Sequence, residues 1–409
     1  MQRPAFADLF CNPAGSPIRE LFPYLSRPGM ISFAGGYPSA ELFDAEGLRD
    51  AAAQALADTA ANFQYGATEG APLLREALAS LSASRGIDCG PADILVTTGS
   101  QQAFDLLVRI FINAGDVVHV ETPAYPAAIQ ALKLAGARIE AIPADQAGLQ
   151  VEAAAAKLEL AQAVRPKLLY TVPAFSNPCG TLLPLERREA LVHLAIEHGF
   201  FIVEDDPYSD LAFTKDLPPP LFAIGERLAG RLHNPVIYLS SLSKTVAPGL
   251  RIGWMIAPQE VLRRCAIAKQ TSDLCTSPLA QAIAALYLRS GRYPHAVARA
   301  CTEYGRRMHA MIGALQKELP GTLTVNPAAG GLFLWAESRA QADPQQLFQA
   351  HVDHGVLYVP GTAFYPADPN PASMRLSYGT PGVEQILEGV RRMGRAFRAV
   401  GTNERMARD

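Results

Sequence analysis

The sequence predicts an α/β protein in which helices flank a mostly parallel sheet and a smaller α+β domain follows. Two observations lead to this prediction. Between residues 94 and 142, three apolar runs of strand length alternate with helical segments, and strands that alternate with helices usually pair in parallel. After residue 290, long helical patterns and short, separated strands replace that alternation.

The chain is long enough for more than one hydrophobic core. It has 409 residues, of which 49% are hydrophobic and 18% are charged, as in a globular protein with roughly two or three domains. We expect an N-terminal arm that belongs with the small domain, then a large ligand-binding domain, then a C-terminal small domain. Their expected boundaries are 1–45, 46–290 and 291–409.

The charge balance and the N-terminus argue against two classes of protein. A net charge of −3 lacks the excess of Lys and Arg that nucleic-acid binding needs. Residues 1–8 contain no apolar signal core, and no apolar run is long enough to cross a bilayer. We therefore expect a cytoplasmic protein that acts on small molecules, with no nucleic-acid or membrane partner.

Neither the cysteines nor the histidines predict a metal site. The six cysteines are scattered without a Cys-x-x-Cys pair, so we expect free thiols. His351 and His354 lie close in sequence, but no third ligand accompanies them.

Before the first strand of the sheet, the pattern is mainly helical. A short helix is expected from Ser16, and the pair Gly35 and Gly36 makes either a plain turn or a place where a ligand approaches the backbone. Apolar residues at helical spacing follow Asp44, and a second helix is expected over residues 72–84.

Strands and helices then alternate. The expected strands of the large domain are 94–97, 117–120, 138–142, 168–172, 200–203, 236–239 and 253–257, with helices at 103–112 and 125–135. The last part of the chain is expected to hold short strands within 327–335, 356–361 and 374–378, and helices at 344–354 and 383–400.

Five of the six expected strands that precede residue 245 are followed by polar or aromatic groups. In open sheets, ligands bind at the carboxyl ends of the strands. The groups found there include Thr98 to Gln102, Glu121 to Tyr125, Phe175 to Pro178, Glu204 to Tyr208, and Ser240 to Lys244.

Lys244 follows a strand that we expect to be buried, where an ammonium group is costly unless it is paired or neutral. A neutral lysine amine is a nucleophile that forms Schiff bases, and pyridoxal phosphate is the aldehyde cofactor that most often takes this role. Taken alone, Ser-x-Ser-Lys is more often a surface lysine beside serines that cap a helix. The cofactor hypothesis therefore requires partners for the phosphate, the ring and the substrate.

The sequence offers a candidate for each partner. Ser100 lies in a turn between a strand and a helix, where backbone N–H groups can bind a phosphate, although the same serine could simply cap the helix. Asp205 or Asp206 could pair with a protonated pyridine nitrogen, although most such pairs cap helices or form salt bridges. The other candidates are Ser241, Ser243 and Arg251 for the phosphate, Tyr125 to stack on the ring, Asn177 and Tyr208 for the ring oxygen, and Arg375 for a substrate carboxylate.

The combination of segments resembles the fold-type I, class I and II pyridoxal-phosphate aminotransferases. It is particularly similar to the branch that contains the 2-aminoadipate, kynurenine, branched-chain and aromatic amino-acid aminotransferases. The matching segments span nearly the whole chain: residues 31–38, 64–65, 98–102, 124–126, 176–180, 204–208, 241–245, 251–254, 360–364 and 374–378.

The resemblance implies a role for each candidate. Lys244 would carry pyridoxal 5'-phosphate as a Schiff base, and Asp205, rather than Asp206, would pair with the pyridine nitrogen. Asn177 and Tyr208 would hold the 3-oxygen, and Tyr125 would stack on the ring. The phosphate would be bound by Ser100, Gln101, Ser241, Ser243 and Arg251, and by Tyr65 of a neighbouring subunit, so the resemblance also implies a homodimer.

The substrate site follows from the same resemblance. Arg375 would bind the α-carboxylate, Gly36 and Asn177 would lie close to the substrate, and Arg19 matches the position that meets a second, distal carboxylate. The implied reaction moves the amino group of an L-amino acid of the 2-aminoadipate, aromatic or branched-chain type to a 2-oxo acid, most often 2-oxoglutarate, in ping-pong order. Lys244 would serve as the general base.

Three other functions are alternatives to transamination. A decarboxylase, lyase or synthase could use the same fold and cofactor, and a non-catalytic effector module could bind the cofactor without turnover. A nicotinamide dehydrogenase would need Gly-x-Gly-x-x-Gly after the first strand, where this chain has Thr-Gly-Ser-Gln-Gln-Ala. The sequence does not determine the amino donor, because Phe22, Tyr24 and Tyr37 lie near Arg19 and suit aromatic or branched donors.

Overall fold

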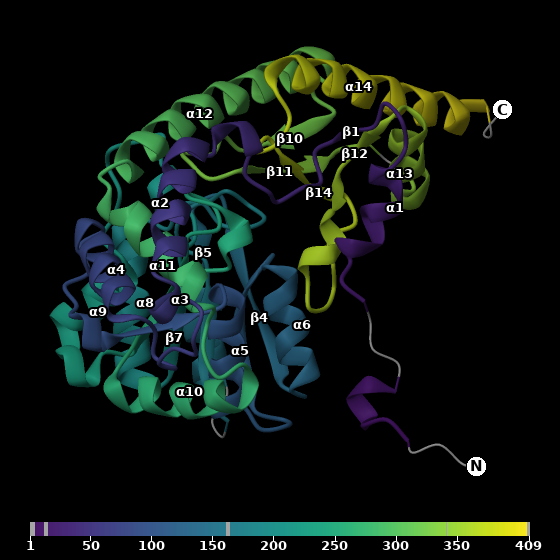
Figure 1. Cartoon of the computed structure of the whole chain (residues 1–409). Helices are drawn as coiled ribbons and strands as arrows, with labels where there is room; N and C mark the ends of the chain where they lie inside the picture. The colour runs from purple at the N-terminus through teal and green to yellow at the C-terminus, as the bar shows by residue number, and fades with distance from the viewer. Residues whose placement is uncertain (1–4, 12–14, 161–163, 341, 407–409) are drawn as a thin grey trace.

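A computed structural model describes residues 5–11, 15–160, 164–340 and 342–406 (Figure 1). Its largest element is an eight-stranded sheet in the order β2-β9-β8-β7-β6-β3-β4-β5. The strands are β2 (Ile94–Thr97), β3 (Val117–Thr122), β4 (Arg138–Asp145), β5 (Gly148–Leu149), β6 (Leu168–Thr171), β7 (Phe201–Asp205), β8 (Val236–Ser241) and β9 (Gly253–Ile256).

The sheet is mostly parallel, as predicted. The pairs β3–β4, β3–β6, β6–β7 and β7–β8 are parallel. Strand β9 runs antiparallel to both β8 and β2, and β5 runs antiparallel to β4. The five adjacent parallel strands therefore end on the same edge of the sheet, and this edge carries the candidate site.

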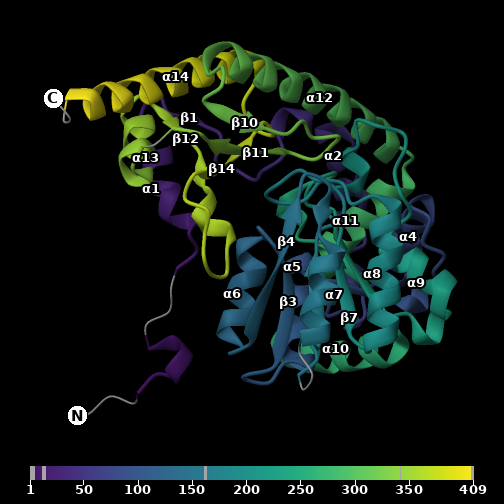
Figure 2. The same cartoon turned by 180° about the vertical axis from the view of Figure 1, so that it is seen from behind.

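Helices cover both faces of this sheet, which explains why its strands are continuous apolar runs. Successive residues of a strand enter different cores: Ile237 and Leu239 pack into one apolar cluster, whereas Val236 and Tyr238 pack into another. From behind, α7, α8 and α9 lie in front of the strands (Figure 2). The helices of this part of the chain are α4 (Pro72–Ser84), α5 (Ser100–Phe111), α6 (Pro126–Leu134), α7 (Val151–Leu160), α8 (Leu185–His198), α9 (Leu221–Ala229), α10 (Gln259–Ser272) and α11 (Pro278–Arg289).

A second body is built on a four-stranded antiparallel sheet in the order β10-β11-β14-β13. Its strands are β10 (Leu323–Val325), β11 (Phe333–Ser338), β13 (Val359–Pro360) and β14 (Ser373–Ser377). The long helices α12 (Tyr293–Glu318) and α14 (Val383–Met406) arch over this sheet in Figure 1, and α13 (Pro344–Asp353) lies beside α14.

The N-terminal arm joins the second body. Strand β1 (Ile31–Ser32) pairs in parallel with β12 (Val356–Leu357), and the amide of Ser377 donates to the Phe33 carbonyl at 2.8 Å. The arm also contains α1 (Phe22–Leu25) and the short turns η2 (Arg19–Leu21) and η3 (Ala40–Leu42), and α2 (Ala45–Ala57) and α3 (Thr59–Asn62) follow.

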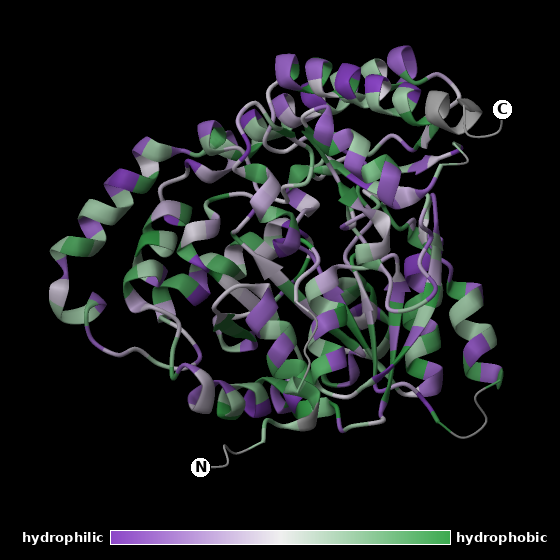
Figure 3. Ribbon diagram, turned by 90° about the vertical axis from the view of Figure 1, so that its right-hand side faces the viewer, coloured by the Kyte–Doolittle hydropathy of each residue, from purple (hydrophilic) through white to green (hydrophobic). Residues whose placement is uncertain are grey.

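One apolar cluster is continuous across the two bodies, since it includes Val118 and Leu239 of the large sheet together with Leu334 and Val390. The division of the chain at residues 45 and 290 therefore stays a prediction. Apolar residues concentrate in the strands and on the inner faces of the helices (Figure 3). Among the described residues, no helix is both long and apolar enough to span a bilayer.

The sequence placed most elements within a few residues. The expected helix at 72–84 and strand at 94–97 match α4 and β2 at both ends. Helix α5 begins at Ser100, earlier than the expected residue 103, because Gly99 turns the chain directly from β2 into the helix with φ +83°. All six cysteines are free.

Candidate active site

Lys244 lies just beyond β8, at the carboxyl edge of the parallel strands. Its side chain is mostly buried, and Nζ donates to the Gly36 carbonyl at 3.0 Å. Burial lowers the Lys244 pKa to about 8, and the nearby cations Arg375 and Arg251 act in the same direction, while Asp205 opposes them. The structure thus holds this amine in surroundings that favour its neutral, nucleophilic form.

Asp205 is the last residue of β7 and is 7% exposed. Its Oδ2 accepts from the Tyr170 hydroxyl at 2.7 Å, whereas Oδ1 is buried without a hydrogen-bond partner among the described residues. Burial raises the Asp205 pKa to about 6, although the Tyr170 bond and the nearby Lys244 and Ser100 act in the opposite direction. An unpaired buried carboxylate oxygen is costly, so this atom is a fitting partner for a cationic ring nitrogen.

Asp206 has a different environment, which distinguishes the two carboxylates. Its Oδ2 accepts from the Tyr238 hydroxyl at 2.9 Å, and its Oδ1 accepts from the Ser209 amide at 3.0 Å. Both oxygens are therefore engaged inside the protein. The geometry favours Asp205, rather than Asp206, as the acid that meets a ligand.

The turn between β2 and α5 forms a cradle with the end of β8. Ser100 is the first residue of α5, so its amide lies at the N-terminus of a helix of 12 residues. The hydroxyls of Ser241 and Ser243 lie 2.8 Å apart, and Arg251 Nη1 lies 3.5 Å from the Ser243 hydroxyl. These hydroxyls, the helix N-terminus and the guanidinium together suit a phosphate.

Glycines make this close packing possible. A Cβ on Gly99 would lie 2.5 Å from Arg251 Nη2, and a Cβ on Gly253 would lie 2.5 Å from the Ser100 amide nitrogen. Arg251 Nη2 also donates to the Thr98 carbonyl at 3.2 Å, which holds the guanidinium beside the turn. Gln101, one residue further along α5, is exposed.

Arg375 brings a buried cation to the other side of the site. It lies in β14 and is 1% exposed, and its Nη1 donates to Asn177 Oδ1 at 2.8 Å. The guanidinium lies over the ring of Phe333 at 4.3 Å and near the ring of Phe364 at 5.1 Å. Burial lowers the Arg375 pKa to about 10.

No carboxylate pairs with Arg375 among the described residues, and its Nε is buried without a hydrogen-bond partner. Its Nη2 donates to the Ala34 carbonyl at 2.6 Å, and a Cβ on Gly36 would lie 4.0 Å from this same nitrogen. The Gly36 backbone therefore lies between the Arg375 guanidinium and the Lys244 amine. A substrate carboxylate would neutralise a charge that the chain leaves unpaired.

Two tyrosines complete the central group. Tyr125 precedes α6, and its pKa is raised by burial and by Asp205, while Arg375 and Arg251 lower it. Tyr208 is 3% exposed, and its pKa is raised strongly by burial and lowered in part by Arg375 and by a hydrogen bond with Asn177. Both phenols therefore share their surroundings with the Asp205 carboxyl and the Arg375 guanidinium.

Two predicted site residues do not join this group. Tyr65 is 79% exposed and its side chain contacts none of the central residues. Arg19 is also exposed, in the turn η2. Its neighbours Ile18 and Leu21 nevertheless pack into the apolar cluster that contains Phe364, so Arg19 lies on an element that borders the site.

Sequence reasoning missed three residues that shape the site: Tyr170, Phe333 and Phe364. Tyr170 belongs to one of the expected strands. Successive side chains of a strand point to opposite faces of the sheet, so Tyr170 lies on the face opposite to Leu169. Nothing local indicates that its hydroxyl meets Asp205. Phe333 and Phe364 lie in matched or neighbouring segments, but their contact with Arg375 depends on the packing of β11 and η8 (Gly361–Phe364).

Pyridoxal phosphate fits the residues present. The cradle at Ser100 and Arg251 suits its phosphate, the unpaired Oδ1 of Asp205 suits its ring nitrogen, and the amine of Lys244 suits its aldehyde. Among these groups, Asp205 Oδ1 is buried without a hydrogen-bond partner among the described residues, and the cationic ring nitrogen of the cofactor is a counterpart of the right charge.

Comparisons with known proteins agree with this chemistry. The model of the family "Aminotransferase class I and II" matches residues 31–392. A 2-aminoadipate transaminase of Thermus thermophilus is 38% identical over 94% of this chain and 94% of its own length. Aromatic-amino-acid aminotransferase 1 of Thermococcus litoralis is 37% identical over 96% of this chain and 94% of its own length.

A solved structure has the same fold. LysN, an alpha-aminoadipate aminotransferase from Thermus thermophilus, was crystallised in complex with N-(5'-phosphopyridoxyl)-L-leucine. It is 36% identical, its TM-score is 0.88, and the match covers 97% of this chain and 98% of LysN.

The raised pKa of Asp205 leads to a prediction for the protein freed of cofactor. The folded state keeps a proton on Asp205 up to a pH of about 6, whereas the unfolded chain loses it near 3.8, so this group's contribution to stability falls as the pH rises between these values. We expect Asp205→Asn to be more stable than the parent by roughly 1–3 kcal/mol at pH 7.5 and by less at pH 4.5. Urea unfolding at both pH values measures the difference.

Cofactor should reverse this order, because only the ionised carboxylate can pair with a cationic ring nitrogen. We expect saturating pyridoxal phosphate to raise the Tm of the parent more than that of Asp205→Asn. The interpretation of Asp205 is wrong if the stability difference does not change with pH, or if cofactor stabilises both proteins equally.

Proposed function

The chain belongs to the class I and II aminotransferase family, and on this premise we propose that it moves the amino group of an L-amino acid with a distal carboxylate to a 2-oxo acid. The protein is an aminotransferase, and its family depends on pyridoxal phosphate. Aromatic and branched donors are the other candidates for the amino acid. We propose 2-oxoglutarate as the acceptor and a ping-pong order for the two half-reactions.

The observation that carries the proposal is the unpaired guanidinium of Arg375. It is buried between two aromatic rings, and no carboxylate neutralises it among the described residues. A planar guanidinium binds a carboxylate through two parallel hydrogen bonds. An α-carboxylate bound there would place the substrate beside Gly36, whose carbonyl accepts from Lys244 Nζ.

Lys244 would hold the cofactor through its amine and act as the base on the substrate. Its pKa of about 8 leaves part of the amine unprotonated near neutral pH, as a general base requires. When bound, pyridoxal phosphate supplies an electron sink for the charge left on the substrate Cα. Lys244 Nζ would take the proton from that Cα, and this removal leaves the charge.

The surrounding residues would orient the reacting groups. Asp205 Oδ1 would keep the ring nitrogen protonated, and Tyr208 and Asn177 would donate to the ring oxygen. The phosphate would lie at the N-terminus of α5, where it would be held by Ser100, Gln101, Ser241, Ser243 and Arg251. Tyr125 would lie against the ring.

Arg19 is the residue proposed to select a donor with a distal carboxylate. It lies exposed on η2, next to residues that pack with Phe364 at the edge of the site. The relatives named for 2-aminoadipate and for aromatic amino acids are nearly equally similar to this chain, so similarity alone does not separate the two donor classes.

We further propose that the protein is a cytoplasmic homodimer. Tyr65 would reach the phosphate of the neighbouring subunit, because its ring is exposed and engages none of the central residues of its own chain. Phe63, two residues before Tyr65, is also 61% exposed, so this segment exposes two large aromatic side chains.

Replacement of Lys244 by alanine tests the central role. We expect turnover to fall by at least about 100-fold, because the base is lost, while the cradle still retains some cofactor. A coupled assay of 2-oxo acid formation and the absorbance of dialysed protein measure the two effects. Lys215→Ala, at an exposed position, serves as the control.

Borohydride reduction gives an independent readout for the same residue. It should attach the cofactor to residue 244 of the parent, as read by peptide mass spectrometry, and to no lysine of Lys244→Ala. A variant that transaminates at a rate near the parent's, or a label on another lysine, would show that the assignment is wrong.

Replacement of Arg375 by alanine tests the carboxylate site. We expect kcat/KM to fall by an amount equivalent to about 2–5 kcal/mol, because the substrate carboxylate loses its partner in a buried site. Arg109→Ala, which removes a surface ion pair with Asp105, should leave kcat/KM unchanged. An unchanged kcat/KM in Arg375→Ala would contradict the proposed role.

A half-reaction screen tests the donor class. The loss of cofactor absorbance is followed with each L-amino acid in turn, and we expect donors with a distal carboxylate to react fastest. Arg19→Ala should slow these donors about 10-fold, the loss of one charge-assisted hydrogen bond, and should leave leucine unaffected. Arg27→Ala, nearby in the arm, is the control. Equal slowing of all donors would exclude a role of Arg19 in selecting them.

A further inference from the structure

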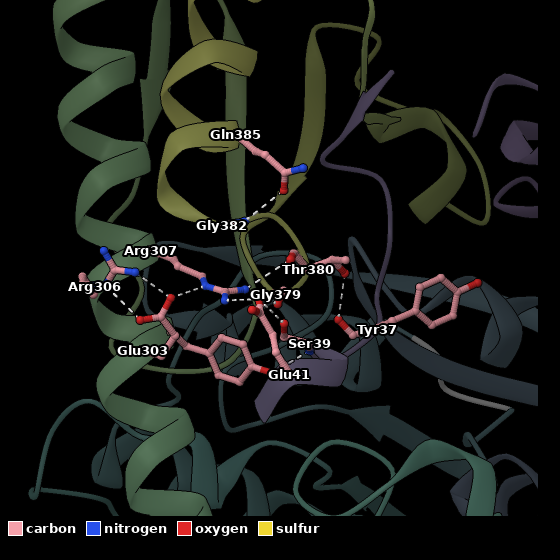
Figure 4. Close-up of polar contacts among 11 residues, drawn as sticks. Tyr37, Ser39, Glu41, Glu303, Arg306, Arg307, Gly379, Thr380, Gly382 and Gln385 are labelled. Atoms are coloured by element: carbon pink, nitrogen blue, oxygen red, sulfur yellow. Dashed lines mark hydrogen bonds and ion pairs between the residues drawn. The ribbon is translucent and has the colours of Figure 1, made fainter. Parts of the chain in front are cut away.

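Arg307 is a buried arginine at the centre of a polar cluster, outside the group of residues that would touch the substrate. It lies in α12 and is 2% exposed. Its Nε donates to Glu303 Oε1 at 2.7 Å, and its Nη2 donates to Glu41 Oε1 at 2.9 Å. Its Nη1 donates to the carbonyls of Gly379 at 3.1 Å and of Thr380 at 3.2 Å (Figure 4). We call Arg307, Glu303, Glu41 and these two carbonyls the Arg307 clasp.

The clasp joins three segments that are far apart in the sequence. Glu303 belongs to α12, Glu41 to η3 in the N-terminal arm, and Gly379 and Thr380 to the loop between β14 and α14. Arg307 is the residue on which the hydrogen bonds of all three segments converge in Figure 4. A guanidinium can do this because its donors leave one rigid plane in several directions.

Two of these segments lead directly into the active site. In the arm, the Gly36 carbonyl accepts from Lys244 Nζ and the Ala34 carbonyl accepts from Arg375 Nη2. In the other segment, Arg375 lies in β14, four residues before Gly379. One of these segments carries the Gly36 carbonyl, which accepts from the Lys244 amine, and the other carries Arg375, the proposed partner of the substrate carboxylate. The clasp thus holds one end of each segment.

Direct contacts keep these two segments in register next to the clasp. The Thr380 hydroxyl donates to the Tyr37 carbonyl at 3.2 Å, and a Cβ on Gly379 would lie 2.9 Å from that carbonyl oxygen. The Ser39 amide donates to the hydroxyl of Tyr304, which lies on α12, at 2.9 Å. A shift of the arm or of the loop at the clasp would therefore move Gly36 relative to Arg375.

We propose that Arg307 is a positioning residue for transamination. Arg307 acts through the arm and through the loop after β14. It sets the distance between the Gly36 carbonyl and the Arg375 guanidinium. The substrate requires this distance, because its α-carboxylate would bind Arg375 while its amino group lies beside Gly36. This inference rests on the proposed role of Arg375. A buried arginine that only stabilised the fold would affect all functions of the protein alike, whereas a positioning residue affects substrate recognition first.

Arg307→Lys provides the first test, because lysine keeps the charge but cannot reach three segments at once. We expect kcat/KM for the amino donor to fall about 10–100-fold, mainly through KM, as misplaced substrate groups do. The rate at which cofactor-free protein binds pyridoxal phosphate should stay within about twofold of the parent's, because the phosphate cradle is built from other elements.

Arg306→Lys is the matched control. Arg306 is the neighbouring residue of α12 and also bonds to Glu303, but it is exposed and donates to neither loop carbonyl. We expect its kcat/KM to equal the parent's.

Glu41→Gln provides a second variant that does not disturb the buried guanidinium, because the Glu41 side chain is 68% exposed. We expect a smaller loss of kcat/KM in the same direction, and less than additive losses when it is combined with Arg307→Lys. This variant decides the matter if Arg307→Lys does not fold.

The cavity beside the clasp allows chemical rescue. It has a volume of about 520 Å³ and is lined by Glu41, Leu42, Arg299, Thr302, Glu303 and Arg307. We expect the KM of Arg307→Ala to be higher than the parent's. Guanidinium chloride, at concentrations far below those that unfold the protein, should lower this KM part of the way back to the parent's value, whereas the same concentration of sodium chloride should not.

The proposal is overturned if folded Arg307→Lys, or Glu41→Gln where the first does not fold, keeps the parent's KM. It is also overturned if cofactor binding slows as much as kcat/KM falls, since that result indicates a general loss of structure. If Arg375→Ala loses kcat/KM in the same assay while Arg307→Lys does not, the inference fails alone. If Arg375→Ala keeps its kcat/KM, the proposed function itself fails.

Discussion

Burial of charge without a partner inside the chain is the constraint on which this site depends. Asp205 and Arg375 are buried, and each leaves an atom without a hydrogen-bond partner among the described residues, while burial lowers the pKa of Lys244. Such burial costs free energy unless the partner is supplied from outside. The fold therefore carries a cost that a cofactor with an aldehyde and a cationic ring nitrogen, together with the carboxylate of a substrate, can offset.

The large sheet makes this burial possible. Parallel strands covered by helices on both faces are rigid and apolar, and they deliver Asp205 and the segment of Lys244 to one edge. A different body supplies Arg375, and the arm inserts the Gly36 backbone between them. The site is thus assembled from three parts of the chain, and its geometry depends on how firmly they are held together.

Fixing those parts together gives a reason for the burial of Arg307, a charged residue outside the site itself. The Arg307 clasp ties the arm and the loop after β14 to α12, and it satisfies its own charge with two carboxylates and two carbonyls. The clasp and the candidate active site therefore differ in whether carboxylates of the chain neutralise their buried arginine. Arg307 is paired with two carboxylates of the chain, whereas Arg375 has no carboxylate partner among the described residues.

The sequence by itself placed most strands and helices within a few residues, and it predicted the mostly parallel sheet and the residues that gather at its edge. These features are encoded locally, by the period of apolar residues and by motifs of a few residues. The tertiary structure distinguishes Asp205 from Asp206, because Tyr238 and the Ser209 amide engage both oxygens of Asp206, whereas one oxygen of Asp205 has no partner among the described residues. It also decided which side chains surround Arg375 and Arg307. Such partners come from strands and loops distant in the chain, and no local period records which of them meet.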